Sequence, residues 1–347
     1  MIGPVLKRER DFGEFLKALW RRGRPAYLPF YEHLASPGFI ARRTGVPFDR
    51  MTRGEEGYWE TYVDFWLGMG YDCIPMEIPP ALPLPAGHGG LSEGSEAFVV
   101  IRSMEDLERY PWPPESDPIE LRHFETVARL LPEGVKIVGG VEAGPFEWAS
   151  RMLGVMGMSY ALADEPELVD QVFERIGKIH ESAARQLASM EVVGALRQGD
   201  DLGFKTSTFL SPNVLRRLVL PIYTRLVSHA HAAGKPFILH SCGNLAGIHE
   251  DLIEGCGIDA KHSFEDVILP VEDFKARYGG RVTALGGLDV DVICRAGERE
   301  LRAYVRRKIE ACWADGWWAL GTGNSLTDYM PVERYMMVLE EGMRAGA

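Results

Sequence analysis

The amino-acid sequence predicts an α/β fold, and within that class a single-domain (β/α)8 barrel over residues 1–347. Short apolar runs alternate with longer amphipathic segments along the whole chain, as in parallel strands joined by helical crossovers. About eight such repeats favour a closed barrel over an open sheet. No Gly-x-Gly-x-x-Gly follows the first apolar run, which disfavours a dinucleotide-binding fold, and no linker divides the chain.

The predicted elements begin with an N-terminal helical extension over residues 9–23 and a first strand at 25–30. Ser36 and Pro37 suit the N-cap and the first position of the next helix. Segment 79–103 is rich in proline and glycine and is predicted to be a hairpin insertion. Further strands are expected at 71–76, 135–140, 193–197, 236–239, 257–260, 281–285 and 317–320. Further helices are expected at 54–69, 118–131, 145–152, 165–190, 211–233, 246–254, 270–278, 297–315 and 331–344.

Composition and charge exclude several classes of protein. The formal net charge of −12 argues against a nucleic-acid binder and against a protein that coats anionic membranes. The five cysteines are odd in number and lack paired spacing, which suits a reducing compartment. Because neither a signal-peptide core nor a long apolar run is present, we expect a cytoplasmic protein.

The most informative stretch runs from Lys235 to Asn244 and reads Lys-Pro-Phe-Ile-Leu-His-Ser-Cys-Gly-Asn. It predicts a short buried strand that ends in His240 and Cys242. In extended backbone, residues two apart point to the same side, so the imidazole and the thiol should project together. Zinc accepts both groups as ligands. On spacing alone, a buried histidine beside an inert cysteine is the commoner explanation of such a pair.

Polar residues also follow the other predicted strands, where the active site of such a barrel is built. A single polar residue after a strand is usually a turn or helix-cap residue, but a repeated pattern suggests a site. The residues are Tyr31 and Glu32, Glu77, Glu142, Asp200 and Asp201, His262, Asp289, and Asn324.

These groups support two kinds of chemistry. His240 and Cys242 supply two metal ligands, and an open zinc site can lower the pKa of a bound thiol. Repulsion within a cluster of carboxylates raises the pKa of at least one of them, and a carboxyl group with a raised pKa is suited to proton transfer. Two other functional motifs, the phosphate-binding Gly-x-x-x-x-Gly-Lys and the Cys-x-x-Cys pair, are missing from the sequence.

Six short motifs stand out along the chain. They are His240-Ser-Cys-Gly-Asn244, Gly199-Asp-Asp-Leu-Gly203, Ser211-Pro212 with Pro221, Asp259-Ala-Lys-His-Ser-Phe-Glu-Asp266, Gly286-Gly-Leu-Asp289 and Gly321-Thr-Gly-Asn-Ser325. Together they resemble the uroporphyrinogen decarboxylase superfamily, which includes corrinoid-dependent methyltransferases. The resemblance covers nearly the whole chain and implies a (β/α)8 barrel.

The methyltransferase branch implies a zinc ion held by a His-x-Cys pair and a later cysteine, with the methyl group carried on a corrinoid of a separate protein. His240 and Cys242 match the pair, but Thr322 stands where the later cysteine is expected. Glu142, His262 and Asp289 are the candidates for the missing ligand. The catalytic candidates are Asp200, Asp201 and Asp289, and those for substrate binding are Tyr31, Glu32, Glu77 and Asn324.

The decarboxylase branch implies an arginine-rich N-terminal segment that meets the carboxylates of uroporphyrinogen. The corresponding residues 25–33 contain no arginine and include Glu32, which would repel such a substrate. We therefore expect a methyl transfer between a corrinoid protein and a thiol or folate. A decarboxylase-type lyase and a non-catalytic ligand-binding barrel stay open as alternatives. A small-molecule substrate, a corrinoid protein and a second copy of the chain are the partners to consider.

Overall fold

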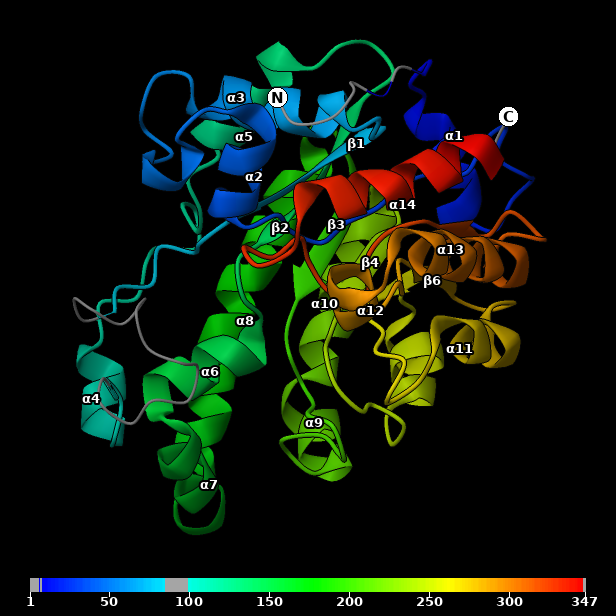
Figure 1. The fold of residues 1–347 in the computed structure, drawn as a ribbon. Coiled ribbons are helices and arrows are strands. Elements are labelled where there is room, and N and C mark those ends of the chain that lie inside the picture. Colours follow the sequence, from blue (N-terminus) through cyan, green and yellow to red (C-terminus); the bar gives the residue numbers. More distant parts are fainter. Residues whose placement is uncertain (1–5, 7, 85–98, 346–347) are drawn as a thin grey trace.

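The computed structural model describes residues 6, 8–84 and 99–345, and its centre is a parallel sheet of seven strands in sequential order (Figure 1). Each strand pairs in parallel with the next one along the chain, and helices pack around the sheet. The strands are β1 (Cys73–Ile78), β2 (Lys136–Val141), β3 (Val193–Gly199), β4 (Phe237–His240), β5 (Ala260–His262), β6 (Thr283–Leu285) and β7 (Trp318–Ala319).

The strand predicted at 25–30 is the main departure from the expected barrel. Only an isolated parallel bridge forms there, between Phe30 and Leu320. The amide of Tyr31 donates to Leu320 O, and the amide of Leu320 donates to Pro29 O, both at 2.9 Å. Pro25 and Pro29 lack amide protons, so this segment cannot form a regular ladder. The structure therefore shows a TIM-like α/β fold, and a fully closed eight-stranded barrel stays a prediction.

The helices mostly follow the predicted boundaries. They are α1 (Phe12–Leu19), α2 (Pro37–Thr44), η1 (Phe48–Arg50), α3 (Tyr58–Gly68), α4 (Met104–Arg109), α5 (Arg122–Leu130), α6 (Pro145–Leu153), α7 (Val155–Asp164), α8 (Pro166–Ser189), α9 (Pro212–Leu218), α10 (Leu220–Ala232), η4 (Asp251–Cys256), α11 (Val271–Tyr278), α12 (Val290–Arg295), α13 (Glu298–Cys312) and α14 (Val332–Ala345). Among the described residues, no helix is both long and apolar enough to cross a membrane.

Three local predictions need correction. The helix expected over 211–233 is broken into α9 and α10 at Val219, because Pro221 cannot donate an amide hydrogen bond to the preceding turn. The helix expected at 246–254 is a π-type turn, η4. The strand expected at 257–260 begins at Ala260, because Gly257 adopts a left-handed conformation that ends η4. Helices α4, α7 and α12 were not predicted.

The hairpin expected within 79–103 falls largely on residues 85–98, which lie outside the described residues. Before them, Pro80 forms an antiparallel bridge with Ile119.

The interior of the sheet is filled by one side chain from each strand, and α1 covers one end of it. Phe12, Phe15 and Leu19 of α1 pack against this layer. The strands contribute Cys73, Val138, Ala195, Ile238, Ala260, Leu285 and Ala319, and Tyr31 joins them from the segment bridged to Leu320. Because strand residues alternate in direction, residues two positions further along also point inward. That alternation brings His33, Arg197, His240 and His262 to the carboxyl ends of the strands.

Candidate metal centre

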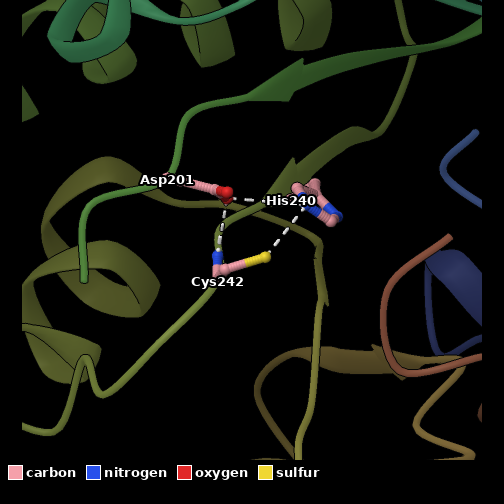
Figure 2. Close-up of side chains that lie close together, drawn as sticks. All are labelled: Asp201, His240 and Cys242. Carbon is pink, nitrogen blue, oxygen red and sulfur yellow. Dashed lines mark hydrogen bonds and ion pairs between the residues drawn. The ribbon is translucent and has the colours of Figure 1, made fainter. Parts of the chain in front are cut away.

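Three possible ligands meet at the ends of β3 and β4. One ligand atom each from Asp201, His240 and Cys242 lies within 4.8 Å of the other two. Figure 2 shows the three side chains converging from two neighbouring segments. His240 Nε2 lies 3.5 Å from Cys242 Sγ and 3.6 Å from Asp201 Oδ1. The Cys242 amide donates to Asp201 Oδ1 at 2.9 Å, which holds the carboxylate beside the pair.

This donor set fits a zinc ion. Zinc bonds to nitrogen, oxygen and sulfur in a tetrahedron place the ligand atoms about 3.4–3.6 Å apart. The two distances from His240 Nε2 match that spacing. Three protein ligands would leave a fourth position open for a substrate, as in catalytic zinc sites.

A chain of hydrogen bonds orients the His240 ring. His240 Nδ1 lies 2.7 Å from His262 Nδ1, and His262 Nε2 lies 3.1 Å from the carbonyl oxygen of Thr322. A carbonyl oxygen can only accept a hydrogen bond, so His262 Nε2 must carry the proton. In the neutral His262 ring, Nδ1 then has no proton and accepts a hydrogen bond from His240 Nδ1. The lone pair of His240 Nε2 therefore faces Asp201 and Cys242, as metal ligation requires.

The thiol of Cys242 is half-buried among polar groups. Asn324 Nδ2 donates to Cys242 Sγ at 3.1 Å, and Ser263 Oγ lies 3.5 Å from it. Burial and the negative charge of Asp201 raise the pKa of the thiol. A divalent cation would reverse this, because it stabilises the thiolate and the carboxylate together. The chemistry of the donor set therefore favours a bound metal.

The third ligand candidates from the sequence lie elsewhere. Glu142 forms an ion pair with Arg53 at 2.8 Å and is nearly half exposed. Asp289 caps α12 by accepting hydrogen bonds from the amides of Asp291 and Val292. His262 contacts His240 rather than Cys242 or Asp201. The structure thus brings Asp201, predicted as a catalytic acid, to the place where a third ligand was missing.

Thr322 does not turn its side chain to the cluster. Its hydroxyl donates to Glu32 Oε2 at 2.6 Å, and its amide donates to Glu32 Oε1 at 2.5 Å. Tyr335 also donates to Glu32 Oε1, at 2.7 Å. Burial raises the pKa of Glu32 to about 7, while these hydrogen bonds oppose the rise. Glu32 was predicted to bind substrate, but it is fully buried behind Thr322.

Two other predicted residues have structural partners. Asp200 is fully buried and accepts hydrogen bonds from the Phe146 and Glu147 amides and the Tyr223 hydroxyl. It therefore anchors the start of α6, and burial raises its pKa to about 7. Tyr31 stacks on Phe15 in the interior layer and does not reach the site.

A buried group of charged and aromatic residues supports His240. Two of its members, His33 and Glu77, follow predicted strands in the sequence, and only Arg197 carried no functional prediction. The His33 ring stacks on His240, and His33 Nε2 lies 3.6 Å from Glu77 Oε1. The guanidinium of Arg197, 2% exposed, lies 3.1 Å from the same oxygen. Burial raises the pKa of Glu77 to about 7. Period-two alternation from Tyr31 and Ala195 could have indicated that His33 and Arg197 point inward.

Lys261 is a further residue that the sequence did not reveal. Its neighbours Ala260 and His262 point inward, so Lys261 points outward, toward the helices. Its ammonium group donates to the carbonyls of Ser263 at 2.6 Å and Ser241 at 3.5 Å, which ties the ends of β4 and β5 together. Burial lowers its pKa to about 8. A lone lysine in a strand carries no sequence signal for such a role.

Comparison with known proteins places the fold and the family. A methyltransferase from Methanosarcina mazei matches with a TM-score of 0.77 and 16% identity, over 98% of this chain and 100% of that one. A weaker match, with a TM-score of 0.49 and 12% identity over 92% and 98% of the chains, is a Listeria monocytogenes protein provisionally named a vitamin-B12-independent methionine synthase. No curated protein sequence matches. The family model for uroporphyrinogen decarboxylase (URO-D) matches residues 90–342, so the chain belongs to that family.

Proposed function

We propose that this protein is a metal-dependent methyltransferase that transfers a methyl group between a corrinoid and a thiol. The observation that carries the proposal is the convergence of Asp201 Oδ1, His240 Nε2 and Cys242 Sγ on one point at the strand ends. Their hydrogen bonds leave all three atoms able to act as ligands. A zinc ion bound there would lower the pKa of a substrate thiol and raise its nucleophilicity.

The residues of this chain hold and shape the site. His262 fixes the His240 tautomer, and Asn324 donates a hydrogen bond to Cys242 Sγ. In the transfer, the substrate thiol would release its proton to solvent, and its sulfur would take the methyl group from the corrinoid of the partner protein. The electron pair of the broken carbon–cobalt bond would stay on cobalt, so the products would be a thioether and a reduced corrinoid. A folate acceptor would release one proton from its ring nitrogen in the same way and would use the same methyl donor.

The methyl donor would be a corrinoid on a partner protein that docks over the strand ends. Several of the exposed apolar side chains lie in segments that follow the strands, and a docking protein could cover them. They are Leu34, Met156, Tyr160, Phe204, Phe209, Val267 and Tyr329.

The family name makes a lyase the second candidate. Uroporphyrinogen carries carboxylates that need cationic partners. The arginine nearest the interior, Arg197, is buried and already paired with Glu77. The neighbouring Glu32 and Glu77 would repel such a substrate wherever they are ionised. The charge distribution therefore favours methyl transfer over decarboxylation.

Metal analysis tests the site directly. Protein purified without chelator should contain about one equivalent of zinc or another divalent metal, measured by plasma mass spectrometry. Asp201→Ala and Cys242→Ala should each lower the metal affinity at least about tenfold, since each removes a ligand. Asp289→Asn is the matched control, because Asp289 caps α12 away from the cluster. Wild-type protein with less than about a tenth of an equivalent would overturn the metal mechanism.

An activity assay separates the two candidate functions. Methylcobalamin serves as donor with a panel of small thiols and with tetrahydrofolate, and mass spectrometry detects the methylated product. We expect a methylated product that depends on Cys242. Uroporphyrinogen turnover at an ordinary enzyme rate, with no methyl transfer to any acceptor, would instead establish the lyase.

A further inference from the structure

Thr322 stands at the branch point of the hydrogen bonds that reach two of the three metal-ligand candidates. It follows β7 and is completely buried. Its side chain and amide contact Glu32, its carbonyl contacts His262, and its hydroxyl contacts the Asn324 amide. A residue with this position can control both ligands without touching a metal.

One branch runs from Thr322 to His240. The Thr322 carbonyl accepts from His262 Nε2 at 3.1 Å and from the Gly287 amide at 2.9 Å. The first of these bonds fixes the His262 tautomer, which in turn fixes that of His240 through the 2.7 Å contact between their Nδ1 atoms.

Close packing around this carbonyl requires glycine at position 286. A Cβ atom there would lie 2.1 Å from Thr322 O and 2.9 Å from His262 Nε2. The backbone at Gly286 also has φ +68°, which favours glycine. The Gly286-Gly287 motif thus makes room for the carbonyl–imidazole contact.

The other branch runs from Thr322 to Cys242. The Thr322 hydroxyl accepts a hydrogen bond from the backbone amide of Asn324 at 3.3 Å. The side-chain nitrogen of Asn324, Nδ2, donates to Cys242 Sγ at 3.1 Å. The hydroxyl can accept from Asn324 because its own proton is given to Glu32. The loop after β7 therefore presents the Asn324 amide group to the thiol.

Glu32 anchors the branch point. Its carboxylate accepts two hydrogen bonds from Thr322 and one from Tyr335, whose hydroxyl lies 2.5 Å from that of Tyr71. An ionised carboxylate accepts all these bonds, and a buried network with every member paired holds one geometry.

We propose that Thr322 is a positioning residue that orients His240 and Cys242 for metal binding, through His262 and Asn324, from its anchor on Glu32. This rests on the proposed metal site. Thr322 stands where the resemblance implies a cysteine ligand, but it would support the ligands without binding the metal. Asp201 would serve as the third ligand instead. Residues behind metal ligands typically change metal affinity about 10–100-fold when they are altered.

Thr322→Val and Thr322→Ser test the proposal as a matched pair. Valine keeps the shape but loses the hydroxyl, whereas serine keeps the hydroxyl. Competitive titration against a chromogenic chelator should show metal affinity about 10–100-fold weaker in Thr322→Val and near wild type in Thr322→Ser. Cobalt substitution gives a second readout, because the thiolate-to-cobalt absorption should shift in Thr322→Val only. Thr327→Val is the control, since the Thr327 hydroxyl is buried and makes no hydrogen bond with described residues.

Two milder variants keep the test valid if loss of the Glu32 partner prevents folding. His262→Phe interrupts the His240 branch, and Asn324→Ala interrupts the Cys242 branch at a half-buried position. Each variant should weaken metal binding at least about threefold. The double variant Thr322→Val with Asn324→Ala should lose less free energy of metal binding than the two single losses added together. Wild-type affinity in Thr322→Val, or in both His262→Phe and Asn324→Ala, overturns the positioning role. Wild-type protein without metal would instead overturn the proposed function itself.

Discussion

His33 lies face to face with His240, with ring centroids 3.8 Å apart and planes 10° apart. Two stacked imidazolium cations would repel each other strongly at this distance. Burial lowers the pKa of each ring well below its ordinary value, and their positive neighbours lower it further. Both rings are therefore neutral at neutral pH, and the stack would present His240 to the proposed metal as an uncharged ligand.

The stack predicts that ring shape, rather than the imidazole nitrogens of His33, supports His240. His33→Phe keeps a flat neutral ring and should leave metal affinity within about threefold of wild type. His33→Ala opens a cavity beside His240 and should weaken metal binding about tenfold or more, as other losses of ligand support do. Chelator competition measures both. Equal affinity in the two variants would show that the stack is not needed.

Asp201 can be exchanged for a softer ligand. Asp201→Cys would make a donor set of one histidine and two cysteines, which zinc also accepts. We expect this variant to retain stoichiometric metal and, when loaded with cobalt, to show stronger thiolate-to-cobalt absorption than wild type. Asp201→Ser is the size-matched control and should bind metal more weakly. An unchanged cobalt spectrum in Asp201→Cys would remove Asp201 from the ligand set.

Gly286→Ala should damage the site from a distance. The new methyl group would lie 2.1 Å from Thr322 O and must displace that carbonyl from His262. We expect weaker metal binding and a loss of about 1–3 kcal/mol in the free energy of unfolding, from strain at a left-handed position. Gly280→Ala is the control, because no atom lies within 4 Å of a Cβ built there. Equal metal affinity and stability in the two variants would contradict the close packing described here.

Asp289 should matter for stability and not for the metal. Its carboxylate accepts from the amides of Asp291 at 2.8 Å and Val292 at 3.3 Å. Asp289→Ala should lower the free energy of unfolding by about 1 kcal/mol, the usual cost of a lost helix N-cap. Metal content should stay at the wild-type level. Loss of metal in this variant would return Asp289 to the list of ligands.

His180 predicts a pH dependence of stability outside the site. Its ring is fully buried, and burial lowers its pKa from 6.5 to about 4. Between those values the unfolded chain binds a proton that the folded chain does not, so stability falls as the pH falls. From pH 7 to pH 5 this group alone costs about 2 kcal/mol.

Urea unfolding of wild type and His180→Gln at both pH values isolates this contribution, since other groups cancel in the difference. The stability advantage of wild type over the variant should shrink by about 2 kcal/mol at pH 5. An unchanged difference would mean that the pKa of His180 is the same in the folded and unfolded protein.

Much of the fold was predictable because the spacing of apolar residues along the chain distinguishes strands from helices. The strands at 71–76, 135–140 and 193–197 lie within a few residues of β1, β2 and β3. The closure of the barrel was not predictable, because the apolar run at 25–30 looks like a strand although its prolines limit it to a single bridge. Pairing across the ends of the sheet depends on residues far apart in the sequence.

The sequence by itself indicated His240 and Cys242 as the functional pair, because residues two apart in an extended backbone point to the same side. It also determined the family, through motifs spread over the chain. Only the tertiary structure decided that Asp201 joins the pair while Glu142 and Asp289 do not. It likewise decided that Thr322 turns toward Glu32. These outcomes depend on strand register and on hydrogen bonds between distant segments, which local sequence patterns do not encode.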